Sequence, residues 1–368
     1  NNTRPQNHII PGDFIFCRKR SLMEHRPVGN TGISIPRVIF GTSALGNLYS
    51  ALSDETKTAI VRECLQHVPK PVVFDSAGKY GAGLALEKLG EILRNLKVKP
   101  EDIIISNKLG WLRTPLTGPE PLFEKGVWEG IRHDAIQLIS YNGILECMEQ
   151  GSQLLGEEYR PRMVSVHDSD EYLNAAGSDD DFKRLFRNIR EAYKALSVLK
   201  SEGKVKALGV GAKNWLTVRM IADEVDLDWV MIANSMTIYR HPKELLDFME
   251  NLHKRGIAII NSAVFHAGFL TGGEFFDYVK IKPDSDENKA RFIWREKFFS
   301  LCKKHDVIPA NACVRFALTP PGVFSVSLNT SKPGNVKKNV ESVECSIPDD
   351  FWKEMLGNRL IDRDYPYL

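Results

Sequence analysis

The stretch VVFDSAGKYGAG, residues 72–83, ends an apolar run with a carboxylate, Asp75, and places a phenol, Tyr80, among glycines five residues later. Two other apolar runs end in side chains that can carry charge, Lys108 and His167. An acid, a phenol, an ammonium and an imidazole at the ends of apolar runs raise the question of what chemistry they could perform together.

The chemistry that suits this set is proton transfer to an oxygen. A phenol with a pKa of about 10 is a poor acid or base at neutral pH. A nearby ammonium stabilises the phenolate and lowers that pKa, and a carboxylate can hold the ammonium in place. A histidine beside the phenol can orient the substrate oxygen. The set favours reversible protonation of a carbonyl or alcohol oxygen while hydride moves at carbon. No nucleophile stands next to a base and no metal-ligand spacing occurs, so we expect no metal site.

Each of the four side chains also has a structural interpretation of its own. Asp75 could cap a turn, Lys108 could extend to solvent, His167 could be a hydrogen-bonded core histidine and Tyr80 an ordinary loop aromatic. These interpretations weaken when the residues are taken together, because the carboxyl ends of neighbouring parallel strands meet at one face of a barrel.

Eight short apolar runs alternate with amphipathic segments. The runs are near-continuous and rich in Val and Ile, which is typical of parallel strands buried on both faces. Their ranges are 37–42, 72–77, 102–110, 163–168, 205–212, 229–235, 257–263 and 323–329. The helical patterns cover 55–67, 84–96, 138–155, 181–200, 243–254, 287–305 and 309–318.

The alternation predicts an α/β protein of the (β/α)8, or TIM, barrel class. A doubly wound open sheet is the alternative, but no GxGxxG follows the first run, which counts against a Rossmann fold. We expect a hairpin at 26–36, and long loops at 111–137 and 264–286, after strands three and seven. Residues 23–368 are expected to form one barrel domain, with 1–22 as an N-terminal extension. The helix at 181–200 should end at a left-handed Gly203.

Composition excludes several classes of protein. The 368 residues carry 49 Lys and Arg against 47 Asp and Glu, a balance that does not suggest nucleic-acid binding. No apolar run approaches the ~20 residues of a membrane helix, so no membrane contact is expected. The six cysteines are scattered without a CxxC pair, which favours free thiols and a reducing, cytoplasmic location. We expect a monomer or small homo-oligomer with a small-molecule sugar or aldehyde substrate.

From about residue 26 to 343 the chain resembles the aldo-keto reductase superfamily. DSAGKYGAGLALEKLGEIL is similar to that family's D-T-A-x-x-Y-G-x-S-E-x-x-L-G, and its Asp, Tyr, Lys, His tetrad matches Asp75, Tyr80, Lys108 and His167. VHDSDEYL, GVGAKNW and VFHAGFLTG resemble the aldose 1-dehydrogenase branch, which includes D-threo-aldose (L-fucose), L-galactose and pyridoxal dehydrogenases. The resemblance implies oxidation of a ring hemiacetal to a lactone with NAD.

The resemblance also implies a nicotinamide cofactor held after strands five to eight. NADP-using relatives place Lys and Arg in strand eight, because a 2′-phosphate favours charge-assisted bonds. This chain has Asn329 and Asn335 at those positions, with Lys332 and Lys338 nearby, so we predict NAD, with NADP less favoured. The expected cofactor-binding residues are Gly41, Thr42, Asp75, Asn214, Asn234, Ser262, Val264, Phe265, Gly268, Leu270, Asn329, Thr330, Ser331, Asn335 and Asn339.

Substrate contacts are expected from aromatic and polar residues around the tetrad. Trp111 is either a wall for the sugar, since aromatic faces pack on apolar ring faces, or an ordinary core residue. His266, Asp168 and Asp170 could also face substrate hydroxyls, and Asp168 could equally be structural. The expected substrate residues are Tyr80, Trp111, His167 and Phe265.

The sequence leaves two other functions open and disfavours a third. One is an NADPH-dependent aldehyde or ketone reductase, and another is a non-catalytic nucleotide-binding regulatory subunit. The third, a sugar-phosphate isomerase or aldolase, is disfavoured because no glycine cluster joined to basic residues is present and Tyr80 would have no role.

Overall fold

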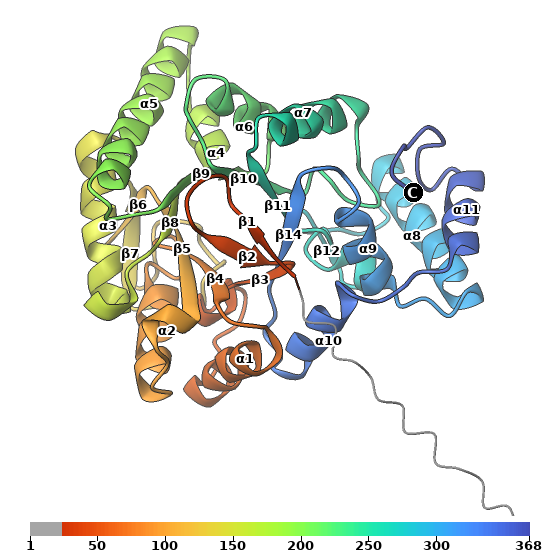
Figure 1. Ribbon diagram of the computed structural model, residues 1–368, viewed down its shortest axis with the longest axis horizontal. Helices are drawn as coiled ribbons and strands as arrows, with labels where there is room; N and C mark the ends of the chain where they lie inside the picture. Colours follow the sequence, from red (N-terminus) through yellow and green to blue (C-terminus); the bar gives the residue numbers. More distant parts are fainter. Residues whose placement is uncertain (1–23) are drawn as a thin grey trace, which may run out of the picture.

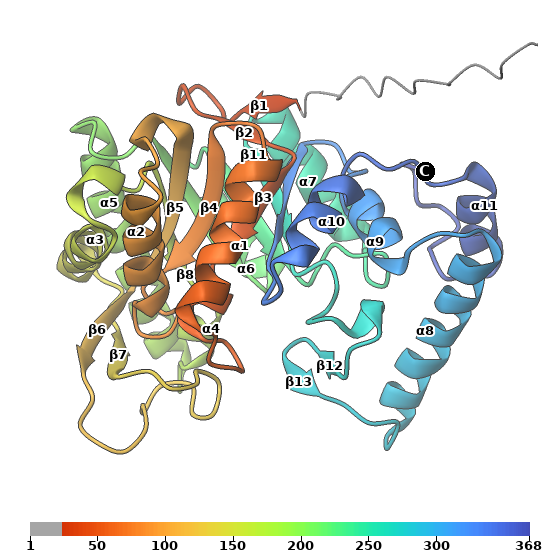
Figure 2. The same ribbon diagram turned by 90° about the horizontal axis from the view of Figure 1, so that it is seen from below.

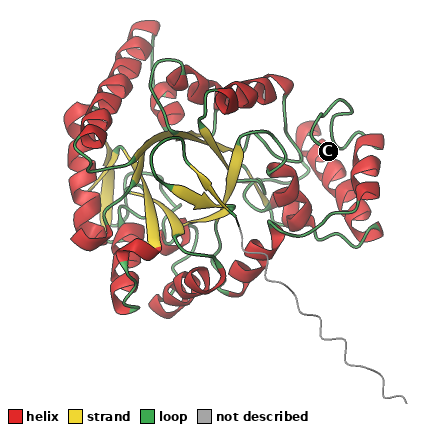
Figure 3. Cartoon of the chain, in the orientation of Figure 1, coloured by secondary structure: helices red, strands yellow, loops and turns green. Residues whose placement is uncertain are grey.

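The structure is a computed structural model that describes residues 24–368, so the extension predicted at 1–22 lies outside the described residues. Eight parallel strands form a closed barrel in the order β10-β11-β14-β3-β4-β5-β8-β9. Figures 1 and 3 show these strands in the centre, with helices packed around them. The predicted barrel is confirmed, and the alternative of an open sheet is wrong.

The barrel strands match the predicted runs to within two residues at each end. Their bounds are β3 Val38–Gly41, β4 Val72–Ala77, β5 Ile103–Leu109, β8 Met163–His167, β9 Ala207–Ala212, β10 Trp229–Ala233, β11 Ala258–Ser262 and β14 Val323–Leu328. Every residue of β4, β5 and β8 is buried. This burial on both faces is the reason that their sequences read as continuous apolar runs.

A layer of large side chains fills the closed end of the barrel. Trp229 is fully buried among inward-facing aliphatic residues such as Ile104 and Ile260. A Cβ on Gly209 of the neighbouring strand would lie 2.1 Å from the Trp229 ring. A glycine in β9 therefore makes the room that the indole occupies, and the barrel is a packed core with its functional groups at the carboxyl ends.

The helices surround this barrel. The predicted ones are α1 Asp54–His67, α2 Leu84–Asn95, α3 Tyr141–Leu155, α5 Asp179–Ser201, α7 Lys243–Lys254, α8 Asp286–Lys304 and α9 Pro309–Ala317. The structure adds the short helices α4 Ser169–Asn174, α6 Trp215–Ala222, α10 Gly334–Ser342 and α11 Asp349–Gly357, which were not predicted. Helix α3 begins later than predicted because Ser140 caps it. Gly203 is left-handed, with φ +73°, as predicted.

The segments outside the barrel are more ordered than the sequence indicated. The predicted N-terminal hairpin is present as β1 His25–Pro27 and β2 Ser34–Pro36. The expected loop after β5 instead contains an antiparallel hairpin, β6 Trp111–Pro115 with β7 His133–Gln137. The segment after β11 holds the short helix η4 Phe269–Thr271 and the strands β12 Phe275–Phe276 and β13 Val279–Lys280. Figure 2 shows β6–β7 and β12–β13 at one end of the barrel and β1–β2 at the other.

The described residues contain no helix with both the length and the apolar composition needed to cross a membrane. Five of the six cysteines lie in this part of the chain, and each is a free thiol. Burial raises the pKa of the Cys147 thiol to about 11, so it stays protonated and unreactive at neutral pH.

Candidate active site

The four residues singled out by the sequence meet at the carboxyl ends of three neighbouring strands, β4, β5 and β8. Lys108 forms an ion pair with Asp75, and both side chains are almost completely buried. Ser106 donates a hydrogen bond of 3.1 Å to the other carboxylate oxygen of Asp75. The Lys108 ammonium lies 4.9 Å from the centroid of the Tyr80 ring, and the His167 ring meets Tyr80 edge-on at 5.6 Å.

Glycines bring the backbone of Tyr80 to this position. Tyr80 packs directly on the short helix η1, Ser43–Gly46. A Cβ on Gly46 would lie 2.7 Å from the Tyr80 carbonyl carbon, and a Cβ on Gly81 would lie 2.3 Å from the Gly46 oxygen. Gly81 also has φ +62°, a region that side-chain-bearing residues avoid. The glycines beside the phenol therefore serve close approach and a left-handed turn.

Burial determines the protonation states at the centre of the site. Desolvation raises the pKa of Tyr80, and Lys108 opposes that rise without overcoming it. The expectation that Lys108 leaves Tyr80 with a lowered pKa is therefore wrong as a net effect. Burial, followed by Lys108 and Lys79, holds the pKa of His167 well below its usual value. Burial disfavours the Lys108 ammonium, but Asp75 and Tyr80 nevertheless raise the pKa of Lys108.

At neutral pH the site thus holds a neutral phenol and a neutral imidazole beside a charged ammonium. A neutral phenol can donate its proton to a developing alkoxide, and its phenolate, stabilised by the ammonium, can take the proton back. A neutral imidazole can donate one N–H without adding charge. The arrangement is suited to proton transfer at a single substrate oxygen, in either direction.

Aromatic side chains from the β6–β7 hairpin lie against the tetrad. A Cβ on Gly78 would approach the Trp111 carbonyl oxygen to 2.5 Å, so the hairpin lies directly on the turn that carries Tyr80. The indole Nε1 of Trp111 is buried and has no partner among the described residues, which leaves it available to a substrate oxygen. The Trp128 ring lies 5.8 Å from Tyr80. Sequence reasoning missed Trp128, because its loop shows no periodic pattern.

Other polar residues proposed as substrate contacts are engaged in structural bonds. His266 is fully buried, with its Nε2 2.8 Å from the Thr237 hydroxyl and its Nδ1 2.5 Å from Asp277. The interpretation that His266 faces substrate is wrong, because both its ring nitrogens anchor the segment after β11. Asp170 accepts hydrogen bonds from the backbone N–H groups that follow β9. Asp168 lies 3.4 Å from His167 Nε2.

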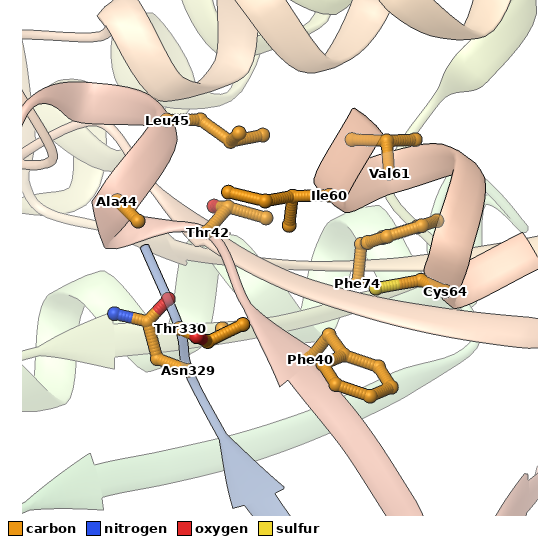
Figure 4. A pocket seen from close by; sticks show the side chains of 11 residues that line it. Phe40, Thr42, Ala44, Leu45, Ile60, Val61, Cys64, Phe74, Asn329 and Thr330 are labelled. Carbon is orange, nitrogen blue, oxygen red and sulfur yellow. The ribbon is translucent and has the colours of Figure 1, made fainter. Parts of the chain in front are cut away.

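Most of the residues expected to hold a cofactor follow β10, β11, β14 and β3, while Asp75 is on β4 and Asn214 follows β9. Gly41 and Thr42 line a small pocket together with Asn329 and Thr330. Figure 4 shows the side chains of Thr42, Asn329 and Thr330 at this pocket. Asn329 donates a hydrogen bond of 2.6 Å to the Ser43 hydroxyl. The ends of β14 and β3 are thereby joined. On α10, Asn335 and Asn339 are four residues apart and share a helix face.

Some of these residues have side chains already used within the fold. The Thr42 hydroxyl donates to β4, and Asn214 uses its Oδ1 to cap α6. Ser262 donates its hydroxyl to β10, while Val264 and Leu270 are buried in the core. Phe265 is partly buried against the core, and Ser331 is exposed. Thr42, Asn214, Ser262, Val264 and Leu270 can therefore contribute backbone groups or position other residues, but they offer no free side-chain donor.

Two features of this part of the barrel fit a nicotinamide dinucleotide. Asn234 has φ +59° and is 4% exposed, and its Oδ1 has no partner among residues 24–368, so it can accept from a carboxamide. Gly268 has φ +94° with open space where a Cβ would stand, so a ligand can approach this backbone closely, while its N–H donates to the Phe265 carbonyl at 3.1 Å. Asn234 follows β10, which stands four strands from β4 in the closed barrel and therefore opposite the strand that leads to Tyr80.

Comparison with known proteins agrees with this geometry. The Aldo/keto reductase family model matches residues 37–357. The chain is 29% identical to pyridoxal 4-dehydrogenase of Microbacterium luteolum over 92% of this chain and 98% of that protein. It is 26% identical to D-threo-aldose 1-dehydrogenase of a Pseudomonas species over 90% and 96%. An aldo-keto reductase structure from Bacillus halodurans superposes with a TM-score of 0.67 at 18% identity, covering 92% of this chain and 97% of that one.

The family match spans nearly all of the barrel and includes every strand that carries a tetrad residue. The buried Asp75–Lys108 pair, the phenol above it and the adjoining imidazole are consistent with hydride-transfer chemistry coupled to proton transfer. This chain belongs to the aldo/keto reductase family and is an oxidoreductase that acts on a small molecule with a nicotinamide cofactor.

Proposed function

We propose that this enzyme oxidises a free aldose of the L-fucose, D-threo-aldose or L-galactose type at its anomeric carbon, forming the lactone, with NAD as acceptor. The observation that carries the proposal is the buried Asp75–Lys108 ion pair directly beneath Tyr80 and next to His167. The likeness to an aldose 1-dehydrogenase and a pyridoxal dehydrogenase supports this choice of substrate class.

In this mechanism Tyr80, as its phenolate, removes the proton from the anomeric hydroxyl, and a nicotinamide held near Asn234 would supply the hydride acceptor for the same carbon. Lys108 stabilises the phenolate, and Asp75 keeps the ammonium charged and in place. His167, neutral at physiological pH, donates an N–H to the substrate oxygen and sets its approach to Tyr80. In the reverse direction Tyr80 is the acid.

The proposal of NAD over NADP rests on the residues after β14. Asn329 and Asn335 offer uncharged amides, which suit ribose hydroxyls better than a 2′-phosphate dianion. Lys332 and Lys338 are exposed side chains nearby. Asn234 would hold the carboxamide, and the pyrophosphate would lie along the segment around Gly268, where no side chain obstructs the backbone.

The aromatic residues beside the tetrad suit a pyranose. Trp111 and Trp128 belong to the same apolar cluster as Tyr80, and each has a flat apolar face. Aromatic faces pack on the C–H face of a sugar ring, while the free Trp111 N–H can bond a ring hydroxyl. A neutral sugar therefore fits this wall better than a strongly charged substrate.

The test is absorbance of the reduced nicotinamide when enzyme meets NAD or NADP with a panel of aldoses and pyridoxal. Reduction of NAD by one group of aldoses is the expected result, and equal or better catalytic efficiency with NADP would refute the cofactor choice. Replacing Tyr80 by Phe should lower kcat at least the ~100-fold typical of a lost acid–base group. Tyr159→Phe is the matched control, because that phenol bonds Val98 away from the tetrad.

A second candidate is an aldehyde or ketone reductase, which the raised pKa of Tyr80 favours, since a neutral phenol is ready to donate a proton. No reduction of NAD or NADP with any sugar, together with oxidation of NADPH or NADH by simple aldehydes, would indicate this function. Tight cofactor binding without turnover in either assay would instead indicate a regulatory nucleotide-binding protein.

A further inference from the structure

Lys79, the residue immediately before Tyr80, is a buried lysine that the proposed mechanism does not use. Its ammonium lies 2.6 Å from Asp168, 2.8 Å from Glu124 and 3.0 Å from Glu171. Only 4% of Lys79 is exposed. We call these four residues the Lys79 cluster. Burial disfavours the charged ammonium, but the three carboxylates outweigh it and raise the pKa of Lys79, which keeps this lysine charged.

The geometry assigns the Lys79 cluster to holding segments together rather than to binding substrate. An ammonium has three N–H donors, and three carboxylates lie within hydrogen-bonding distance of this one. The carboxylates come from two segments that are distant in sequence. Glu124 belongs to the loop between β6 and β7, Asp168 follows β8, and Glu171 is on α4. One buried charge thereby ties that loop to the end of the barrel.

Glu124 extends this connection to the catalytic phenol. While Oε1 of Glu124 pairs with Lys79, Oε2 accepts a hydrogen bond of 2.7 Å from the Trp128 indole. Trp128 is 8% exposed and packs against Tyr80 at 5.8 Å. The Lys79 ammonium also lies 5.1 Å from the centroid of the Trp111 ring. Both indoles beside the tetrad therefore depend on the position of Lys79.

We propose that Lys79 is a positioning residue: acting through Glu124, it fixes the β6–β7 loop so that Trp128 and Trp111 form the wall of the substrate pocket beside Tyr80. Lys79 and Tyr80 are adjacent in sequence, so one turn of backbone carries both the phenol and the lysine that holds the covering loop. The identity of the substrate beside this wall rests on the proposed function. The role of Lys79 in holding the loop does not.

The first test is limited trypsin digestion, read by intact mass, of the full chain and of the variants Lys79→Met and Glu124→Gln. Lys125 and Arg132 are exposed cleavage sites within the fixed loop. Loss of one charge-assisted hydrogen bond should accelerate cleavage at these sites about tenfold or more. Lys88→Met is the matched control, because Lys88 pairs with Asp54 and Glu91 on the outer surface.

Cleavage at wild-type rates in Glu124→Gln overturns the proposal, and this variant decides the matter if Lys79→Met does not fold. Faster cleavage in both variants, with the Lys88→Met control unchanged, supports it. That readout needs no substrate, so it is independent of the proposed function. If no aldose is oxidised but cleavage still accelerates, the proposed function fails and the positioning role stands.

Kinetics give the second test once a substrate is known. Both variants should raise the Michaelis constant for the substrate about tenfold, the loss expected for one charge-assisted hydrogen bond. The dissociation constant of the cofactor should stay unchanged, and Lys79→Arg, which keeps the charge and the donors, should restore part of the loss. An unchanged Michaelis constant in both Lys79→Met and Glu124→Gln refutes the link to the substrate pocket.

Discussion

Replacing Lys108 by Met tests how strongly the site depends on its buried ion pair. Asp75 is 2% exposed and Lys108 is 4% exposed, so neither has water to replace its partner. After the change, the Asp75 carboxylate keeps only the Ser106 hydroxyl as a side-chain partner within the described residues. Breaking a buried pair from one side leaves an uncompensated charge and costs about 3–5 kcal/mol of unfolding free energy.

The double variant Asp75→Asn with Lys108→Met separates this cost from a simple packing defect. Removing both charges leaves no unpaired ion, so the double variant should recover a large part of the loss that Lys108→Met causes. Urea denaturation of the wild type, both single variants and the double variant gives the four free energies of the cycle. The reasoning is refuted if Lys108→Met lies within about 0.5 kcal/mol of wild type, the range of an ordinary surface change.

Further predictions concern pH and close packing. Because burial raises the pKa of Tyr80, kcat/KM for oxidation should keep rising above pH ~10, and a plateau near neutrality would contradict this. The pKa of His167 is lowered in the folded state, so the unfolded chain binds more protons below pH ~6.5 and stability decreases as the pH is lowered. Urea midpoints of His167→Gln should therefore decrease less than those of the wild type as the pH is lowered. Gly209→Ala, with its Cβ 2.1 Å from Trp229, should lower stability by ~1–3 kcal/mol; an unchanged melting temperature would refute the clash.

The sequence predicted the barrel and the position of the tetrad because both follow from local pattern. Buried parallel strands appear as apolar runs, and the run at 72–77 coincides with β4. Asp75, Lys108 and His167 could be placed together because the carboxyl ends of neighbouring strands share one face. Patterns of six to nine residues carry little periodic signal, so α4, α6, α10 and α11 were not predicted, although the nine-residue α9 was.

What the tertiary structure decided depends on contacts between distant parts of the chain. The direction of the Tyr80 pKa shift follows from how much solvent its neighbours exclude, which residue types and spacing do not reveal. Lys79 pairs with Asp168 across 89 positions of sequence and with Glu124 from a loop that has no periodic pattern. Local pattern therefore determined which groups stand at the barrel end, while packing between segments determined their protonation and what covers them.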